Sequence, residues 1–563
     1  MYNDTKLRQN KRLDMKYPYD NLENFTLPSL FDRSIKLYSK NVALGWADGD
    51  TMTYEELNEK VIQMVELLTQ NGISKGDKVV LLSQNMPNWA VAYFAITYFG
   101  GVVVPVLPDF HTSDIHHILK HSEAKAVFVS DAQLAKIEEN EAPSVAFVIK
   151  LDNLEIIDEL NNKSYFAKIK EKISSKKTTK PNEDDLASLL YTSGTTGHSK
   201  GVMLSHKNLV TNALSAFENI DLDNTDVALS ILPLAHTFEC TTGMTVPLVH
   251  GASIRYIDKA PTPSVLLKAF KQVNPTMMLS VPLIIEKIYK NKVLAKFNSS
   301  FITKNLYKVP YFRKKLNKIA GKKLMETFGG KMRFFGIGGA PLSQYVAEFL
   351  YEADFPYVIG YGLTETAPLL TGGTVVNERA KLFSAGKAMH GVELKIIDNE
   401  ICAKSPSIMM GYYKDDEKTK EVFTDDGWLL TGDLGYIDKD NYLFINGRSK
   451  NVIIGPAGEN IYPEQIEATI NQNNLVLDSL VIEQDSKLVA RIHLDYELID
   501  DMLKADKQAD SKVRQEIAQL LEDMRVEINT QVTSFFRITK FIEQIEPFVK
   551  TPTKKIKRYL YTD

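Results

Sequence analysis

The first 180 residues alternate between helical and strand-like hydrophobic patterns, and this alternation restricts the chain to few folds. Apolar residues recur at helical spacing across residues 54–71, whereas residues 78–82 and 126–129 are short apolar runs typical of buried strands. Strands that alternate with helices form mostly parallel sheets covered by helices. We therefore expect an α/β fold whose large N-terminal domain consists of layered, mostly parallel sheets with helices.

Residues 89–107 form a stretch without charge that is long enough to cross a bilayer. Gly100-Gly101 divides it into a helical half and a valine-rich half, and Pro105 and Pro108 follow closely. A buried helix that leads into a core parallel strand explains this pattern better than a membrane span, which is the alternative.

The rest of the chain adds two smaller parts. Turn signals at residues 398–400 and 438–441 separate short strands and predict a small antiparallel part. From Arg448 onward, a long amphipathic pattern at residues 510–532 and a lysine-rich tail predict a small, separate α+β C-terminal domain. The expected boundaries are 1–447 for the N-terminal domain and 448–563 for the C-terminal domain.

Charge and cysteine usage exclude several classes of protein. The net charge is −4 and the isoelectric point is about 6.3, so no global charge indicates nucleic acid as a partner. The two cysteines, Cys240 and Cys402, form neither a CxxC pair nor a disulfide framework, which fits a reducing compartment. The first residues are polar and do not read as a secretory signal. We expect a cytoplasmic protein.

Residues 191–206 read YTSGTTGHSKGVMLSH and combine hydroxyl groups, glycines and one lysine. Glycines bring backbone N–H groups close to a ligand, hydroxyl and N–H groups then bind phosphate oxygens, and Lys200 adds a positive charge. A Ser/Thr-rich turn between strands is the alternative. The spacing excludes a Walker A loop, because Lys200 follows Gly197 by three residues. GIGGAP (336–341) and GYGLTE (360–365) lack the third glycine of a Rossmann fingerprint.

Three later motifs contain groups that suit the rest of a nucleotide. GIGGAPL at residues 336–342 predicts a strand ending in a tight loop that a flat ring can approach, although an ordinary strand–turn–helix junction fits equally. In GYGLTETAP at residues 360–368, the Tyr361 ring can stack on a purine and the Glu365 carboxylate suits Mg²⁺. In TGDLGYID at residues 431–438, the Asp433 carboxylate suits two ribose hydroxyls.

Two further residues carry no assignment on their own. His236 lies among apolar residues in LPLAHTFEC, a setting typical of a core histidine. Lys555 lies in the tail segment TPTKKIKRYL, and lysines in such tails are normally solvated.

Taken in order, these motifs resemble those of the adenylate-forming superfamily, which includes acyl-CoA synthetases, luciferases and the adenylation domains of peptide synthetases. The resemblance covers nearly the whole chain. LPLAHTFEC, GPAGENIYP (455–463) and TPTKKIKR are similar to the long-chain fatty acid–CoA ligase branch. Two departures are visible: Ser199 replaces the usual proline before Lys200, and Ile454 stands where many relatives carry a lysine.

The resemblance implies an ATP-dependent ligase that requires Mg²⁺. A long-chain fatty acid would react with ATP to give acyl-AMP and pyrophosphate, and coenzyme A would then form the thioester and release AMP. One alternative is an acyl-AMP ligase that loads an acyl carrier protein. An alternative of another class is a degenerate relative that only binds nucleotide or lipid, although the intact charged residues of the motifs argue against it.

The resemblance also implies roles for individual residues. It implies catalytic roles for Lys555, Lys200, Glu365 and His236, the last as a gate beside the acyl pocket. Glu365 and Thr196 are the implied magnesium ligands. Lys450 is the implied hinge of a mobile C-terminal domain, whose rotation would bring Gly458 toward CoA. The implied ATP/AMP-binding residues are Thr192, Ser193, Gly194, Thr195, Thr196, Gly197, Lys200, Gly339, Ala340, Pro341, Tyr361, Gly362, Thr364, Asp433 and Arg448.

Residues 287–333 are strongly basic and carry a single acid, Glu326, among interleaved aromatic residues. One interpretation is a solvated helical face. The other is a peripheral contact with anionic lipid on the inner face of a membrane, because basic side chains are attracted to anionic headgroups and aromatic rings favour the interface.

Overall fold

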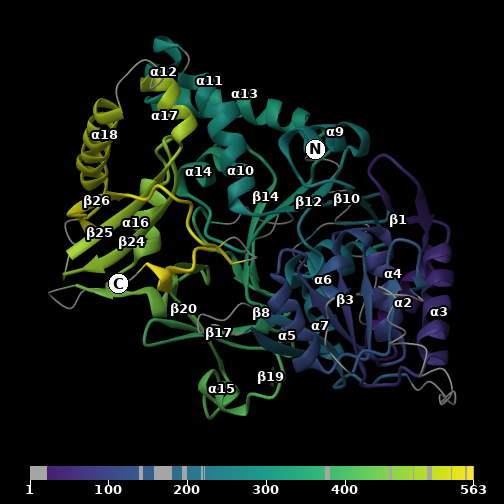
Figure 1. Cartoon of the computed structure of the whole chain (residues 1–563). Helices are drawn as coiled ribbons and strands as arrows, with labels where there is room; N and C mark the ends of the chain where they lie inside the picture. The colour runs from purple at the N-terminus through teal and green to yellow at the C-terminus, as the bar shows by residue number, and fades with distance from the viewer. Residues whose placement is uncertain are drawn as a thin grey trace.

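The structure is a computed structural model, and Figure 1 shows the whole chain. It describes residues 22–138, 144–157, 180–192, 199–216, 220, 222–298, 300–373, 381–455, 460–485, 487–503, 510–533, 536–551 and 555–561.

One large sheet has eight strands and a parallel centre. The strands from β8 through β4, β3 and β5 to β6 pair in parallel, and antiparallel strands occupy both edges. The predicted strands 78–82 and 126–129 are β3 and β5, which confirms both. In sheet order the strands are β19 (Gly411–Tyr412), β9 (Lys200–Ser205), β8 (Leu186–Thr192), β4 (Val102–Val106), β3 (Lys78–Leu82), β5 (Ala126–Val129), β6 (Phe147–Lys150) and β7 (Glu155–Ile156).

A second large sheet has nine strands. It is parallel from β14 to β1, so the carboxyl ends of these strands share one edge. In sheet order the strands are β16 (Lys387–Ala388), β15 (Leu369–Gly372), β14 (Tyr357–Gly362), β13 (Phe334–Ile337), β12 (Met277–Ser280), β10 (Val227–Ser230), β11 (Ser253–Tyr256), β1 (Val42–Trp46) and β2 (Thr51–Thr53). The two sheets confirm the predicted layered α/β class.

Helices cover these sheets, and local sequence explains where several begin. The helix α3 starts with a capping box in which Thr53 and Glu56 satisfy each other's backbone N–H groups. Apolar side chains at helical spacing bury one face of α3, as predicted for residues 54–71. The helices of this part are α2 (Leu27–Tyr38), α3 (Tyr54–Gln70), α4 (Pro87–Tyr98), α5 (Thr112–Ser122), α6 (Ala135–Glu138), α7 (His206–Ser215), the π-helix Phe238–Thr245, α8 (Val246–Val249), α9 (Pro263–Val273), α10 (Pro282–Ile288), the π-helix Tyr289–Leu294, α11 (Ala295–Asn298), α12 (Phe301–Tyr307), α13 (Pro310–Thr327), α14 (Gln344–Glu352) and α15 (Asp416–Glu421).

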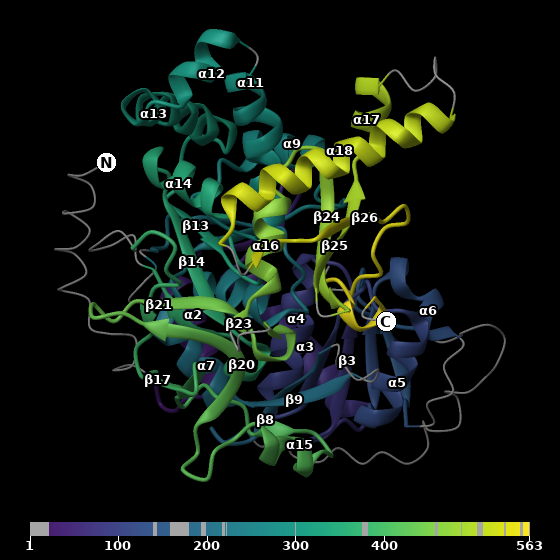
Figure 2. The ribbon, with the colours of Figure 1, turned by 90° about the vertical axis from the view of Figure 1, so that its left-hand side faces the viewer.

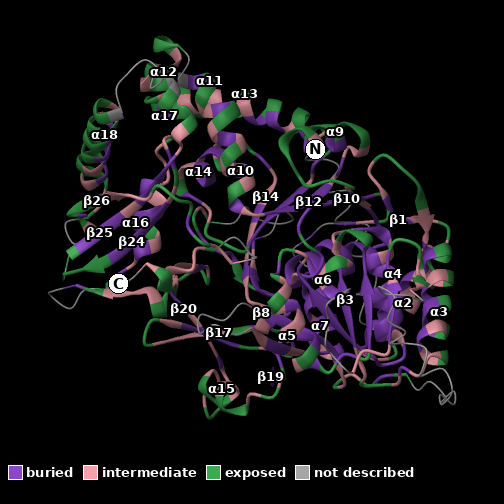
Figure 3. Ribbon diagram, in the orientation of Figure 1, coloured by how far each residue is buried: buried purple, intermediate pink, exposed green. Residues whose placement is uncertain are grey.

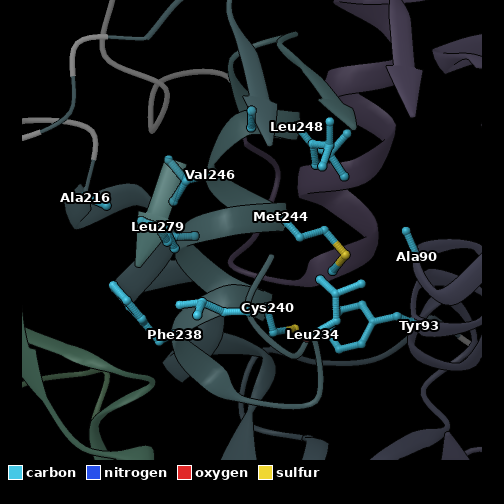
Figure 4. Close-up of a cluster of buried hydrophobic side chains, with 14 of the residues drawn as sticks. Ala90, Tyr93, Ala216, Leu234, Phe238, Cys240, Met244, Val246, Leu248 and Leu279 are labelled. Atoms are coloured by element: carbon cyan, nitrogen blue, oxygen red, sulfur yellow. The ribbon is translucent and has the colours of Figure 1, made fainter. Parts of the chain in front are cut away.

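The uncharged stretch 89–107 folds as predicted. It forms most of α4 and then the fully buried parallel strand β4. Figure 4 shows Cys240 and Met244 of the π-helix pointing toward Tyr93 and Ala90 of α4 in the core. Within the described ranges, no helix is long and apolar enough to cross a bilayer.

A four-stranded antiparallel sheet follows, in the order β17 (Glu393–Ile397), β18 (Glu400–Lys404), β20 (Leu429–Ile437) and β21 (Leu443–Arg448). The two predicted turns lie between β17 and β18 and between β20 and β21, which confirms the antiparallel part. Its register places Asp433 opposite Arg448.

The C-terminal part has its own α+β core, packed beside the larger body (Figure 2). Ile466, Ile492, Leu521 and Phe541 share this core. The predicted long helix 510–532 is α18, which confirms it, while the domain boundary after residue 447 stays a prediction. The elements are β22 (Ile453–Ile454), β23 (Asn460–Ile461), α16 (Pro463–Ile470), β24 (Val476–Gln484), β25 (Lys487–Leu494), α17 (Tyr496–Leu503), α18 (Asp510–Gln531) and β26 (Lys540–Glu543).

Candidate active site

The carboxyl ends of β13 and β14 carry two of the predicted motifs. Ligands in open α/β sheets bind at this edge. After β13, a Cβ added to Gly338 would lie 3.0 Å from the Phe238 ring, so the chain passes close to the π-helix. Gly339 adopts φ +83°, and Gly339, Ala340 and Pro341 are exposed. The tight loop predicted here is therefore present and accessible.

The turn after β14 presents Thr364 and Glu365. Gly362 passes so close to the returning chain that an added Cβ would lie 1.8 Å from the Pro368 carbonyl oxygen. Thr364 and Glu365 then form a single turn of 3₁₀-helix and are half-buried. Glycine at position 362 is thus a geometric requirement of the turn that holds the acid.

Asp433, Arg448 and Tyr361 form a hydrogen-bonded group. Arg448 Nε lies 2.8 Å from one Asp433 oxygen, and the Tyr361 hydroxyl donates to the other at 2.9 Å. Burial raises the pKa of Asp433, while Arg448 and Tyr361 oppose that shift. The structure therefore brings together three residues predicted for the nucleotide. Stacking of the Tyr361 ring on a purine stays a prediction.

Lys555 comes from the tail into the same site. The tail is folded locally, because Thr551 N–H donates to the Lys555 carbonyl at 2.7 Å and Lys555 N–H donates to Thr551 Oγ1 at 3.1 Å. The Lys555 residue is exposed to solvent, yet nearby protein atoms partly desolvate its ammonium group. That surrounding protein and the charge of Arg448 lower the pKa of Lys555, whereas Asp433 and Glu365 act to raise it. The tail lysine thus lies within electrostatic range of both acids.

Lys200 begins β9 and lies beside Tyr412. Its Nζ is 5.0 Å from the centre of the Tyr412 ring, and the Tyr412 hydroxyl donates to Glu365 Oε1 at 2.9 Å. Burial lowers the pKa of Lys200, assisted by Lys418 and Lys450, while Glu365 opposes the shift. Tyr412 was missed by sequence reasoning, since only the pairing of β19 with β9 brings it to the site.

The predicted phosphate-binding loop is described only at its borders. Thr192 ends β8 and is the cross-strand partner of Lys200. The predicted site residues that lie outside the described residues are Ser193, Gly194, Thr195, Thr196, Gly197 and Gly458. Their roles stay predictions.

His236 lies within electrostatic range of Lys555, and its neighbour Phe238 lines an apolar pocket. Its Nδ1 accepts a hydrogen bond from Phe238 N–H at 3.2 Å. Burial lowers the pKa of His236 to about 4, and Lys555 acts in the same direction, so the imidazole is neutral at pH 7. The pocket is small, with a cavity volume of about 20 Å³, and its lining includes Phe238, Thr242, Leu279, Phe334, Gly336, Ile337 and Val358.

The acidic groups fit a magnesium ion that is held mainly by its substrate. Within the part of the chain that the structure describes, no group of three or more histidine, cysteine or acidic residues could hold a metal by itself. Mg²⁺ is commonly bound through one or two carboxylates together with substrate phosphates. Glu365, whose Oε1 is fixed by Tyr412, suits that arrangement.

The predicted hinge lies next to a contact that sequence reasoning missed. Lys450 is in the 3₁₀-helix Ser449–Asn451 directly after β21. Asn451 Nδ2 donates to Glu464 Oε1 at 2.5 Å, which ties the hinge to the first turn of α16. Lys290 Nζ also donates to the Asn471 carbonyl, so the larger body holds the other end of α16.

An exposed glycine loop and a half-buried acid follow the parallel strands β13 and β14, and two lysines and an Asp–Arg pair come from other elements. These groups define a nucleotide-dependent enzyme of the adenylate-forming class. Comparison with known proteins agrees. The model of the AMP-binding enzyme family matches residues 31–413. The chain belongs to the AMP-binding enzyme family.

Several relatives and solved structures resemble the chain over most of its length. A long-chain-fatty-acid–CoA ligase of Drosophila melanogaster, heimdall, is 30% identical over 82% of this chain and 75% of the relative. The peroxisomal long chain acyl-CoA synthetase 7 of Arabidopsis thaliana is 28% identical over 98% of this chain and 86% of the relative. In the fold comparison, O-succinylbenzoate coenzyme A synthetase of Bacillus subtilis with ATP and magnesium has a TM-score of 0.71 at 23% identity, covering 94% of this chain and 98% of that one.

Proposed function

We propose that the protein is an acid–thiol ligase that converts a long-chain fatty acid, ATP and CoA into acyl-CoA, AMP and pyrophosphate. The observation that carries this proposal is the place of Lys555. This lysine of the C-terminal tail interacts electrostatically with Glu365 and with the Asp433–Arg448 pair, which is proposed to bind the ribose. It also lowers the pKa of His236. A cation in this position can stabilise the negative charge that develops as the fatty acid carboxylate attacks the nucleotide.

In the first step, a carboxylate oxygen of the fatty acid attacks the α-phosphorus of ATP. The new O–P bond forms as the bond to pyrophosphate breaks, and no proton needs to move because the nucleophile is already an anion. Lys200 and Lys555 stabilise the negative charge of the transition state. Mg²⁺ held by Glu365 and Thr196 would neutralise phosphate charge when bound.

In the second step, the CoA thiolate attacks the acyl carbonyl of acyl-AMP. The C–S bond forms, the bond from carbon to the phosphate oxygen breaks, and AMP leaves. Rotation about Lys450 would remove Lys555 from the site and bring Gly458 toward the thiol. The neutral His236 can turn without breaking an ion pair, which suits the proposed gate.

Two observations support a long-chain acid. The pocket beside His236 is almost entirely apolar, and relatives across the chain's length carry long-chain names. A 4-coumarate–CoA ligase of Petroselinum crispum is 28% identical over 80% of both chains, so aryl acids belong in the test set. We place the enzyme in the cytoplasm, since Cys240 and Cys402 are free thiols buried in the fold.

Acid-dependent exchange between ATP and labelled pyrophosphate tests this function. We expect exchange with saturated acids of long chain, a strict need for Mg²⁺, and thioester formation on addition of CoA. A thioester formed with a carrier protein but not with CoA would replace the proposal with the carrier-loading alternative. No exchange with any acid would favour a degenerate binding protein.

Lys450→Pro is expected to leave acyl-AMP formation near normal and to reduce thioester formation strongly. Proline fixes φ near −65°, which lies within the range of the 3₁₀-helix around Lys450 and therefore retains the observed arrangement. Single-turnover assays of the two half-reactions measure the effect. Lys450→Ala removes the same side chain without restricting φ and is the control. Normal thioester formation by the proline variant would place the hinge elsewhere.

A further inference from the structure

The helices α10 to α13, residues 282–298 and 300–327, begin in the main core at Ile285 and extend to the surface at α12 and α13. In Figures 1 and 2, two views at right angles, α11, α12 and α13 lie along the upper edge of the molecule. We call this segment the basic arm. It overlaps most of the strongly basic stretch of residues 287–333.

The basic arm carries several large apolar side chains that are mainly exposed to solvent. Phe301 is 83% exposed, Ile302 69%, Tyr311 62% and Ile319 57%. In Figure 3 the ribbon of α12 and α13 carries many residues coloured as exposed. Further exposed apolar residues of the arm are Leu283, Val309 and Phe312.

This exposure belongs to a well-anchored helix. Asn317, Gly321 and Leu324 lie on one face of α13 and are buried, and a Cβ added to Gly321 would lie 2.7 Å from the Ala353 Cβ. Tyr311 and Ile319 are two helical turns apart on another face. The arm therefore presents its apolar residues outward while its inner face is packed.

Cations lie between the exposed apolar residues. Lys315 Nζ is 4.5 Å from the centre of the Tyr311 ring. Among the described residues, no carboxylate forms an ion pair with Lys304, Lys308, Lys314, Lys315 or Lys322. Two basic residues of the arm form ion pairs instead: Arg313 binds Glu352, and Lys318 lies 3.1 Å from Asp354.

We propose that the basic arm docks on a lipid bilayer that contains anionic lipids. Lysines near a membrane surface are attracted to anionic headgroups, and exposed aromatic and aliphatic side chains gain by entering the boundary between headgroups and acyl chains. A nucleic acid would use the lysines but would leave Ile302 and Ile319 in water. The combination of unpaired cations and bare apolar side chains therefore favours a membrane. This inference does not depend on the proposed reaction.

Co-sedimentation of the full chain with vesicles tests the proposal. We expect binding to phosphatidylcholine vesicles that contain phosphatidylglycerol, little binding to phosphatidylcholine alone, and weaker binding as salt rises. Lys308→Glu with Lys315→Glu should lower the apparent affinity at least about tenfold. Phe301→Ser with Ile302→Ser should also lower it, by a factor that changes little with salt.

A matched variant separates the arm from overall charge. Lys125→Glu with Lys439→Glu makes the same change in net charge at exposed lysines outside the arm and should bind like the unmodified protein. Circular dichroism and acyl-AMP formation from detergent-dispersed acid check that each variant is folded. Binding equally to neutral vesicles, no binding at low salt, or equal loss in the matched variant would overturn the proposal. So would unchanged binding by the serine variant, and tight binding to a DNA duplex would then indicate a polyanion site.

Discussion

Lys555→Ala is expected to abolish acyl-AMP formation while supplied acyl-AMP is still converted to thioester at a near-normal rate. The tail lysine lies in electrostatic range of Glu365, Asp433 and Arg448, where it can stabilise charge as pyrophosphate leaves. If the C-terminal part rotates before thioester formation, the second step does not use this lysine. Rapid-quench measurement of each half-reaction separately checks the split.

Two controls make the Lys555 result specific. Lys557→Ala removes a lysine two residues away and should leave both half-reactions unchanged. The pKa of Lys555 is lowered by surrounding protein and Arg448, so the ammonium loses its proton at lower pH than an ordinary lysine. The adenylation rate should therefore fall as the pH rises through that lowered pKa, and thioester formation should not follow it. Equal loss of both half-reactions would contradict the assignment.

The fold class could be predicted because local periodicity dominates it. The division of residues 89–107 at Gly100-Gly101 correctly separated α4 from β4, and apolar spacing located α3 and α18. The π-helix Phe238–Thr245 was not foreseen. Its apolar and polar residues are almost all buried, so no amphipathic pattern marked it.

The sequence motifs of the site could be recognised more easily than the full set of residues that contact one another there. Motif order correctly indicated the family, and the structure brings Lys555, Glu365, Asp433 and Arg448 together, although their roles stay predictions. Tyr412 could not be found, because its contact with Glu365 depends on strand pairing across two hundred residues of chain. Glu464 was missed because its contact with Asn451 forms only when α16 packs beside the predicted hinge, which the local sequence does not indicate.

The charges around Asp433 are consistent with the proposed role of Lys555 in the C-terminal tail. Burial raises the pKa of Asp433, and Arg448 and Tyr361 oppose that shift, so both partners favour the anion that accepts from hydroxyl groups. The Arg448 side chain is already paired with Asp433. Of the two lysines proposed to stabilise the leaving group, only Lys555 lies on a separate C-terminal segment, which suits the proposal that it is withdrawn after the first step.

Glu365→Ala is expected to slow acyl-AMP formation by about 10²–10³-fold at saturating ATP, the size of effect that follows loss of about 2.7–4 kcal/mol of transition-state stabilisation. Removing the carboxylate takes away the proposed magnesium ligand and leaves Lys200 beside Tyr412 without its acidic neighbour. The Mg²⁺ concentration needed for half-maximal rate should rise in parallel. Titration of Mg²⁺ in the pyrophosphate-exchange assay measures both quantities.

Tyr412→Phe and Glu393→Ala complete this test. Tyr412→Phe deletes the hydroxyl that fixes Glu365 Oε1, so it should raise the Mg²⁺ requirement with a smaller loss of rate, about tenfold, as expected for one hydrogen bond to a charged group. Glu393 is an exposed acid on β17, and its replacement by alanine should change neither quantity. If Glu365→Ala kept the normal rate at saturating Mg²⁺ and ATP, the acid would have no part in the reaction. A Tyr412→Phe variant with an unchanged Mg²⁺ requirement would show that Glu365 holds its position without the tyrosine, because the turn closed by Gly362 and Pro368 is then sufficient.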